Sequence, residues 1–242
     1  MSVLLDVQGV SKSFRGLRAV GNVSFEVEEG AIVALIGPNG AGKTTIFNMV
    51  VGALRPDVGE ILFAGKPIGG LRPDQVCALG IGRTFQIVKP FAGLSVLDNV
   101  IVGALRCCAR VDEARAFAST IVDKLGLGSK RAFPVSSLTL PDRKKLEVAR
   151  ALATRPKLLL LDEVMAGLRS LECDQLIAFL QEINQRDGVT ILLIEHVMRA
   201  VMALAHKVIV LHHGKMIAQG SPAQVILDPA VLECYLGEET LL

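Results

Sequence analysis

The chain carries Gly37-Pro38-Asn39-Gly40-Ala41-Gly42-Lys43-Thr44-Thr45 directly after the apolar run of residues 31–36. This stretch fits G-x-x-x-x-G-K-[ST], the spacing of a loop that leaves a buried strand and cradles phosphates. Glycines let backbone N–H groups approach phosphate oxygens, and a helix from about Thr44 would point its positive end at them. Lys43 would reach the β- and γ-phosphates, and Thr44 the magnesium ion. The alternative is a glycine-rich turn that matches by chance. The pattern predicts a nucleoside triphosphate site.

Composition limits the other classes of function. The 242 residues suffice for one large α/β domain or a domain with an inserted subdomain. Although 51% of them are hydrophobic, no apolar stretch approaches the roughly 18 residues that span a bilayer. The net charge is only +2, from 26 basic and 24 acidic residues, so nucleic acid is a poor candidate partner.

The five cysteines are odd in number and lack metal-ligand spacing, which favours a reduced, cytosolic compartment. Adjacent Cys107 and Cys108 could form a redox or metal feature, but simple packing on a helix is the interpretation we adopt.

The pattern along the chain predicts three regions. Residues 3–35 read as short strands with an antiparallel start. From about 88 to 155, apolar residues recur at helical spacing, which predicts a helical insert. The last third returns to strand-like runs at 157–161 and 189–194, with a helix over 171–185 between them. The whole is therefore expected to be an α/β fold.

Two strand-like runs end in residues suited to phosphate chemistry. The run 158–161 is followed by Asp162 and Glu163, where a buried parallel strand would deliver acids to its carboxyl edge. Asp162 suits magnesium, and Glu163 could polarise an attacking water. The alternative is an ordinary strand followed by a solvated acidic pair. A second run ends before His196, which could donate to a phosphate oxygen. Gln86 could complete the coordination of magnesium.

These motifs and their order resemble the ATP-binding cassette (ABC) ATPases of membrane transporters. The resemblance includes a further stretch before the acidic pair, Leu138-Thr139-Leu140-Pro141-Asp142. The resemblance covers essentially the whole chain. Three stretches are similar to the importer subfamily that moves branched-chain amino acids, with urea and short amides as related cargoes. They are Arg83-Thr84-Phe85-Gln86, residues 94–100 and Tyr235-Leu236-Gly237.

The resemblance implies one domain over residues 1–242, with a P-loop NTPase (RecA-like) core, an N-terminal antiparallel β-subdomain and an α-helical subdomain inserted at about 88–155. It implies an ATPase in which Glu163 activates water, His196 steadies the γ-phosphate, and Thr44, Gln86 and Asp162 hold Mg²⁺. Phe14 would stack on adenine, and Val20 would pack near the sugar or base. The implied nucleotide-binding residues are Phe14, Val20, Gly37, Pro38, Asn39, Gly40, Ala41, Gly42, Lys43, Thr44, Thr45 and Gln86.

Family members work as pairs, with ATP held between the phosphate loop of one subunit and the signature motif of the other. That motif usually reads Leu-Ser-Gly-Gly-Gln, whereas Thr139, Leu140, Pro141 and Asp142 follow Leu138 here. Pro141 lacks an N–H, and Asp142 would place a negative charge where an anion docks. Thr139 could instead cap the next helix. After Glu163, Val164 and Arg169 also depart from the usual residues. We therefore hypothesise a weakened signature in one half of an asymmetric heterodimer.

The resemblance also implies partners and a location: a second ABC ATPase subunit, transmembrane permease subunits, an external solute-binding protein reached indirectly, and a place in the cytoplasm on the inner face of the cell membrane. A lipopolysaccharide-export ATPase is a close alternative, and Arg83-Thr84-Phe85 favours import. A soluble cassette ATPase of repair or translation would usually carry two cassettes or long inserts. A P-loop GTPase would need an N-K-x-D motif, which this sequence lacks.

Overall fold

The computed structural model describes residues 2–84 and 90–239, and its N-terminal part is an antiparallel sheet. This sheet has the order β2-β1-β4-β5. Its strands are β1 (Val3–Phe14), β2 (Leu17–Glu28), β4 (Val58–Phe63) and β5 (Lys66–Pro67). In β2, buried Val23, Phe25 and Val27 alternate with exposed polar residues, so one face packs on the core. The antiparallel start is confirmed, although β1 and β2 are longer than the short strands expected.

The second sheet is mostly parallel and has the order β10-β9-β3-β8-β7-β6. Its strands are β3 (Ile32–Ile36), β6 (Ile81–Arg83), β7 (Leu158–Asp162), β8 (Thr190–Ile194), β9 (Lys207–His212) and β10 (Lys215–Gly220). Every residue of β3, β7 and β8 is buried, as expected for strands covered on both faces. Because β3, β8 and β7 are parallel neighbours, their carboxyl ends meet at one edge of the sheet.

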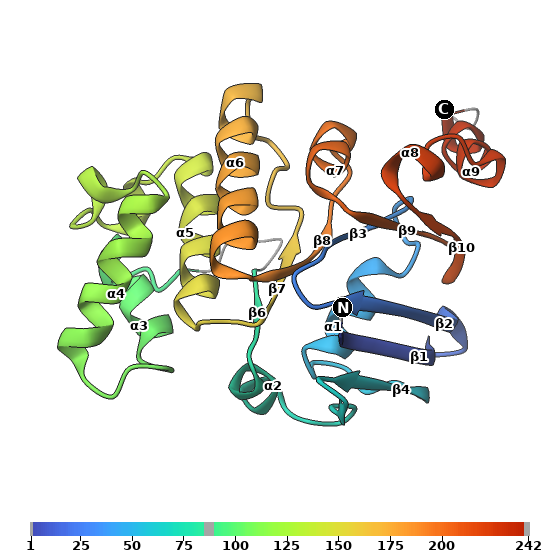
Figure 1. The fold of residues 1–242 in the computed structure, drawn as a ribbon, viewed down its shortest axis with the longest axis horizontal. Coiled ribbons are helices and arrows are strands. Elements are labelled where there is room, and N and C mark those ends of the chain that lie inside the picture. The colour runs from blue at the N-terminus through green and yellow to red at the C-terminus, as the bar shows by residue number, and fades with distance from the viewer. Residues whose placement is uncertain (1, 85–89, 240–242) are drawn as a thin grey trace.

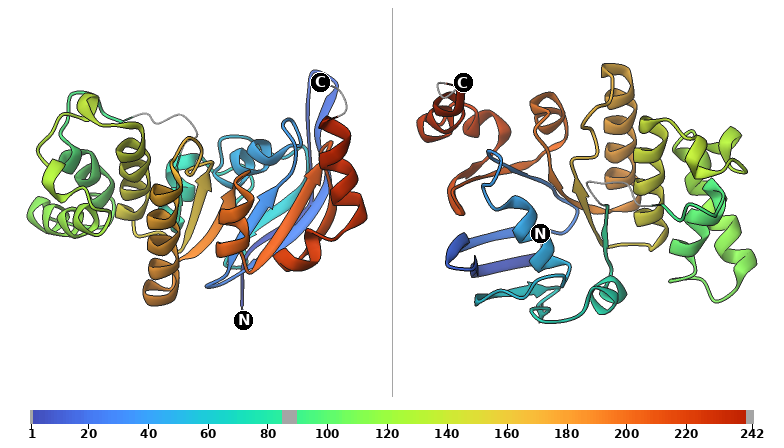
Figure 2. Two further views of the ribbon diagram at one scale, coloured as in Figure 1. Left: turned by 90° about the horizontal axis from the view of Figure 1, so that it is seen from above. Right: turned by 180° about the vertical axis from the view of Figure 1, so that it is seen from behind.

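Three helices form the insert between β6 and β7, at the opposite end of the molecule from the antiparallel sheet (Figures 1 and 2). They are α3 (Val96–Ala104), α4 (Val111–Lys124) and α5 (Leu140–Ala153), and α3 packs against both others. Two short 3₁₀ helices, Gly128–Lys130 and Val135–Ser137, join α4 to α5. The helical insert is therefore present where the sequence predicted it.

The remaining helices flank the sheets. They are α1 (Lys43–Val50), α2 (Pro73–Leu79), α6 (Ser170–Asp187), α7 (Met198–Leu204), α8 (Pro222–Val225) and α9 (Pro229–Glu239). The short helix α2 was not predicted, because Val76 is its one buried residue and gives no periodic signal. Cys107 and Cys108 follow α3 in a turn, so the expectation that they lie on a helix is wrong. Over residues 2–84 and 90–239, no helix is long and apolar enough to cross a membrane.

Candidate active site

The phosphate loop joins β3 to α1 and needs glycine at two positions. Gly37 and Gly42 have φ of 141° and 103°, values that residues with a side chain rarely adopt. A Cβ atom at Gly37 would collide with the carbonyl oxygen of Leu211, and one at Gly42 with that of Ala19. The loop therefore lies close against the neighbouring backbone, with α1 starting directly behind it at Lys43.

The Lys43 ammonium is held inside this loop. Its Nζ donates to the carbonyl oxygens of Gly37 and Pro38, at 2.6 and 2.8 Å. Thr44 is exposed and Thr45 is partly buried in the first turn of α1. The loop thus places a cation and the N-terminus of α1, with its backbone N–H groups, together at the carboxyl edge of the parallel sheet, which is a suitable environment for phosphate.

Asp162, the last residue of β7, is 1% exposed and is paired with Arg83 at the end of β6. Arg83 Nη2 lies 3.0 Å from Asp162 Oδ2, and Arg83 Nη1 donates to Asn48 Oδ1 of α1 at 2.6 Å. Burial raises the pKa of Asp162 above its usual value, against the opposing effect of Arg83. The sequence pattern did not reveal this pairing, although Arg83 ends a strand-like segment next to the acidic strand.

The second carboxylate oxygen of Asp162 suits a metal ion. Oδ1 is buried and has no hydrogen-bond partner among the residues that the structure describes. Carboxylate and hydroxyl oxygens are the ligands that Mg²⁺ prefers, so Asp162 and Thr44 fit this ion chemically. Gln86, the third predicted ligand, lies outside the described residues.

Glu163 and His196 are brought together where β7 and β8 end. The Glu163 N–H donates to the carbonyl oxygen of Ile194 at 2.9 Å, and its backbone has a positive φ of 50°. Its side chain is 21% exposed, and Oε1 lies 4.0 Å from His196 Nδ1. The His196 side chain is more exposed, at 61%. The two residues therefore share an edge that solvent can reach, as a water-activating base and its neighbour should.

Glu195 is a buried acid that the sequence pattern did not single out, because the predicted site residue at this strand end was its neighbour His196. It is 1% exposed, and Oε1 accepts the Met165 N–H at 2.9 Å. Its Oε2 has no hydrogen-bond partner within the described part of the chain. Burial raises the pKa of Glu195 to about 7. The signal was present in the sequence, since the apolar run 191–194 ends directly at this carboxyl group.

Replacing Glu195 by Gln is expected to stabilise the protein more at pH 8 than at pH 5. A raised native pKa favours folding below the unfolded value of 4.5, and this contribution is lost as the pH rises through about 7. The amide of Glu195→Gln stays neutral at both pH values. The difference in free energy of unfolding between the variant and the wild type should therefore be about 2 to 4 kcal/mol larger at pH 8 than at pH 5. Urea denaturation at both pH values measures this, with Glu60→Gln on the exposed surface as control. An equal difference at both pH values would contradict it.

Phe14 and Val20 lie on β1 and β2 of the antiparallel sheet. Phe14 is 42% exposed at the end of β1, and Lys12 Nζ lies 5.9 Å from its ring centroid. Val20 is fully buried behind the loop, next to Gly42. Phe14 thus offers a ring for stacking, whereas Val20 supports the loop from behind. Their contacts with a base or sugar stay predictions.

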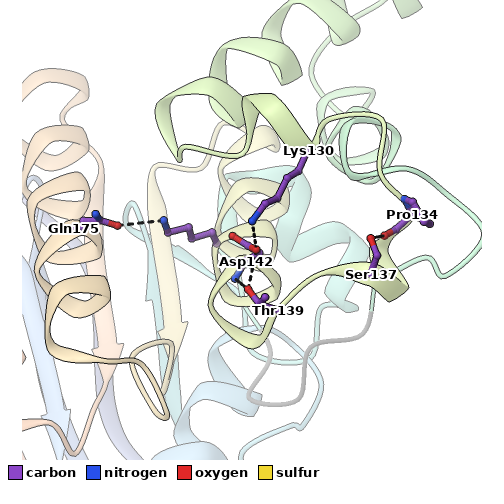
Figure 3. Close-up of polar contacts among 7 residues, drawn as sticks. Lys130, Pro134, Ser137, Thr139, Asp142 and Gln175 are labelled. Atoms are coloured by element: carbon purple, nitrogen blue, oxygen red, sulfur yellow. Dashed lines mark hydrogen bonds and ion pairs between the residues drawn. The ribbon is translucent and has the colours of Figure 1, made fainter.

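The predicted signature residues form the N-terminus of α5 (Figure 3). Thr139 is the N-cap, and its hydroxyl donates to Asp142 Oδ2 at 2.7 Å. Lys130 Nζ lies 2.5 Å from the same oxygen. Pro141 is in the first turn, and Leu140 is half exposed. Desolvation acts to raise the pKa of Asp142, but hydrogen bonds from Lys130 and Thr139 hold it below its usual value.

The expected role of the Asp142 charge is therefore wrong. Its side chain is 12% exposed and is neutralised within the helical insert by Lys130, so it does not present a bare negative charge to an approaching anion. The expected cap at Thr139 is confirmed. Pro141 still lacks the N–H that a glycine would offer there.

Comparison with known proteins agrees with this geometry. Residues 20–166 match the family described as ABC transporter, and residues 215–240 match the family described as branched-chain amino acid ATP-binding cassette transporter. The chain is 38% identical to the high-affinity branched-chain amino acid transport ATP-binding protein LivG of Salmonella typhimurium strain LT2, over 97% of this chain and 98% of that protein. It is 36% identical to BraF of Pseudomonas aeruginosa, a protein with the same description, over the same shares.

A more distant relative and two solved structures complete the comparison. The lipopolysaccharide export system ATP-binding protein LptB of Acidithiobacillus ferridurans is 34% identical over 99% of both chains. A nucleotide-free ATP-binding cassette from an ABC transporter superposes with a TM-score of 0.88 at 28% identity, covering 97% of this chain and 99% of that one. The ADP conformation of an ABC transporter cassette gives 0.88 at 29% identity, covering 98% and 100%.

Proposed function

The chain belongs to the ATP-binding cassette transporter family, and on this premise we propose that it powers the import of branched-chain amino acids. As a member, it is an ATP-binding subunit with ATPase activity. The observation that carries the importer proposal is the match of its C-terminal residues 215–240 to the branched-chain amino acid cassette family. The near full-length similarity to LivG and BraF supports the same cargo. Urea and short amides are the related cargoes that the test below distinguishes.

We assign the chemistry to residues at the carboxyl edge of the parallel sheet. Lys43 and the backbone N–H groups of α1 neutralise the triphosphate, and the Glu163 carboxylate orients and deprotonates the attacking water. His196, 4.0 Å from Glu163, steadies the γ-phosphate. Thr44 and Asp162 would hold Mg²⁺, and Gln86, the third predicted ligand, lies outside the described residues. When bound, this ion neutralises the charge that develops on the phosphate oxygens.

The segment around Phe91 supports contact with permease subunits. Phe91 is 46% exposed, and its ring lies 4.9 Å from the Arg150 guanidinium carbon. Asn99 fixes the same residue, accepting its N–H at 2.8 Å and donating to its carbonyl oxygen at 3.2 Å. Glu147 forms an ion pair with Arg150, and both residues line one pocket together with Phe91. An exposed ring that contacts Arg150, on a main chain fixed by Asn99, suits docking to a membrane subunit, which would place the chain on the inner face of the cell membrane.

We also propose that the functional ATPase is a heterodimer with a second, different ABC subunit. In this family ATP lies between two subunits, and Pro141 removes one N–H from the surface that this chain would offer its partner. The phosphate loop and Glu163 are intact, so this chain is expected to bring one competent half of the catalytic machinery. An external solute-binding protein would deliver the cargo to the assembled transporter.

Replacing Pro141 by Gly and Asp142 by Gln together in the assembled transporter tests the asymmetry. If the signature surface is weakened, the restored N–H should raise ATPase and transport rates by about two- to tenfold, in line with the net contribution of one typical hydrogen bond, about 0.5 to 1.5 kcal/mol. Pro134→Gly, outside α5, is the control. Unchanged rates in the double variant would count against a weakened signature.

Cargo is tested by reconstitution. The chain is purified from its own membranes with its associated subunits, and uptake of radiolabelled leucine, urea and acetamide into proteoliposomes is measured with ATP present. ATP-dependent leucine uptake that Glu163→Gln abolishes would support the proposal. Uptake of urea or acetamide alone would reassign the cargo. Lipid extraction without uptake would favour a lipopolysaccharide exporter, the role named for LptB.

A further inference from the structure

Glu163 has a backbone conformation that its own side chain disfavours. Its φ of 50° lies in the left-handed region, which is unfavourable for a residue with a Cβ atom. Such a conformation persists only when surrounding contacts impose it. The backbone angle also sets the direction of the carboxylate, so whatever holds the backbone aims the proposed base.

Three hydrogen bonds hold the main chain of Glu163. Its N–H donates to the Ile194 carbonyl at 2.9 Å, which ties it to the end of β8. Its own carbonyl oxygen accepts Lys144 Nζ at 2.8 Å and the Ala166 N–H at 3.3 Å. The Lys144 contact is the one that comes from outside the two strand ends, since Lys144 belongs to α5.

Lys144 is an unusual residue for its position. It is 6% exposed, and a buried ammonium is unfavourable unless strong partners compensate it. Its charge also attracts the buried carboxyls of Asp162 and Glu195. The hydrogen bond of the Lys144 ammonium goes to the main-chain carbonyl oxygen of Glu163. A hydrophobic residue would fill this space without the desolvation penalty, so the buried charge calls for another explanation.

We propose that Lys144 is a positioning residue for ATP hydrolysis, which holds Glu163 in its left-handed conformation and aims its carboxylate. This inference rests on the proposed role of Glu163. Thr139, the cap of α5, lies five residues before Lys144 on the same helix. A shift of α5 on contact with the partner ATPase therefore moves the Lys144 ammonium relative to the Glu163 carbonyl. The signature helix of this chain is thus connected to its own catalytic acid.

Lys144→Met tests this in the assembled transporter, because methionine keeps the length and removes the charge. We expect kcat for ATP to fall at least tenfold while the equilibrium Kd for ATP changes less than twofold. Lys144→Arg should recover most of the rate. The matched control is Lys145→Met, one residue along the same helix, whose ammonium lies 3.5 Å from Gln175 Oε1 (Figure 3) and which should stay within twofold of the wild type.

A second measurement does not depend on turnover. Amide hydrogen exchange of residues 163–166 in the nucleotide-free protein should become faster in Lys144→Met and stay unchanged in Lys145→Met, because the contact that fixes the turn is lost. If Lys144→Met does not fold, Lys144→Gln, which keeps a shorter donor, replaces it under the same criteria.

Three outcomes would overturn the inference. In the first, Lys144→Met keeps kcat within twofold of the wild type. In the second, kcat and ATP affinity fall in parallel, which would indicate general loss of structure. In the third, Glu163→Gln retains wild-type turnover, so the assigned role of Glu163 fails and the inference about Lys144 fails with it. Loss of turnover in Glu163→Gln beside undiminished turnover in Lys144→Met would reject the role of Lys144 alone.

Discussion

Glu163→Gln is expected to lower ATP turnover by at least about 100-fold while ATP binding is retained, because a general base contributes typically 10²- to 10⁴-fold. The amide is close in size to the carboxylate and can still occupy the edge next to His196, but it cannot accept a proton. The backbone contacts to Ile194 and Lys144 do not involve the side chain and should persist. The loss is therefore expected in kcat, with little change in the ATP dissociation constant.

The measurement is phosphate release by the assembled transporter, together with equilibrium binding of ATP and sedimentation in ATP and magnesium. Glu172→Gln, a partly buried acid in the first turn of α6 that accepts the Arg169 N–H, is the control and should leave turnover unchanged. ATP bound without hydrolysis should also prolong the life of the ATP-bound dimer. Turnover within threefold of the wild type would show that another group activates the water.

Lys43→Ala is expected to weaken ATP binding by about 10- to 100-fold, because each hydrogen bond to a charged group contributes about 1.5 to 3 kcal/mol. The reason is local to the loop. The ammonium donates to the carbonyl oxygens of Gly37 and Pro38, so its removal takes away both the cation for the phosphates and two contacts that shape the loop. Turnover at subsaturating ATP should fall at least as far.

Isothermal titration with ATP measures the affinity, and the melting temperature without nucleotide reports the effect on the loop itself. Lys66→Ala, at the exposed first position of β5, removes the same charge outside the phosphate loop and should bind ATP like the wild type. Equal affinity of Lys43→Ala and Lys66→Ala would show that the loop binds phosphate through its backbone alone.

The parts of the site that could be predicted are those encoded by neighbouring residues. The phosphate loop and the Asp162-Glu163 pair each combine an apolar strand with its reactive end in no more than fifteen consecutive residues, so their chemistry is visible without the fold. The helical insert was also predictable, because α4 and α5 have regular apolar spacing.

The parts that could not be predicted join distant residues. Arg83 reaches Asp162 across 79 positions, a pairing that arises because β6 and β7 are neighbours in the sheet. Lys144 reaches Glu163 through the packing of α5 next to β7. The Asp142 charge was misread because its partner Lys130 lies twelve positions upstream on a 3₁₀ turn, which has no periodic signal.

The left-handed backbone of Glu163 sets folding against activity at a single position. Glycine would adopt this conformation without strain, so the chain would fold at least as well with the acid removed. The resistance of a residue-163 variant to heat or denaturant therefore does not report whether that variant is active. On the proposed role, the glutamate at this position serves chemistry at the cost of a small conformational disadvantage.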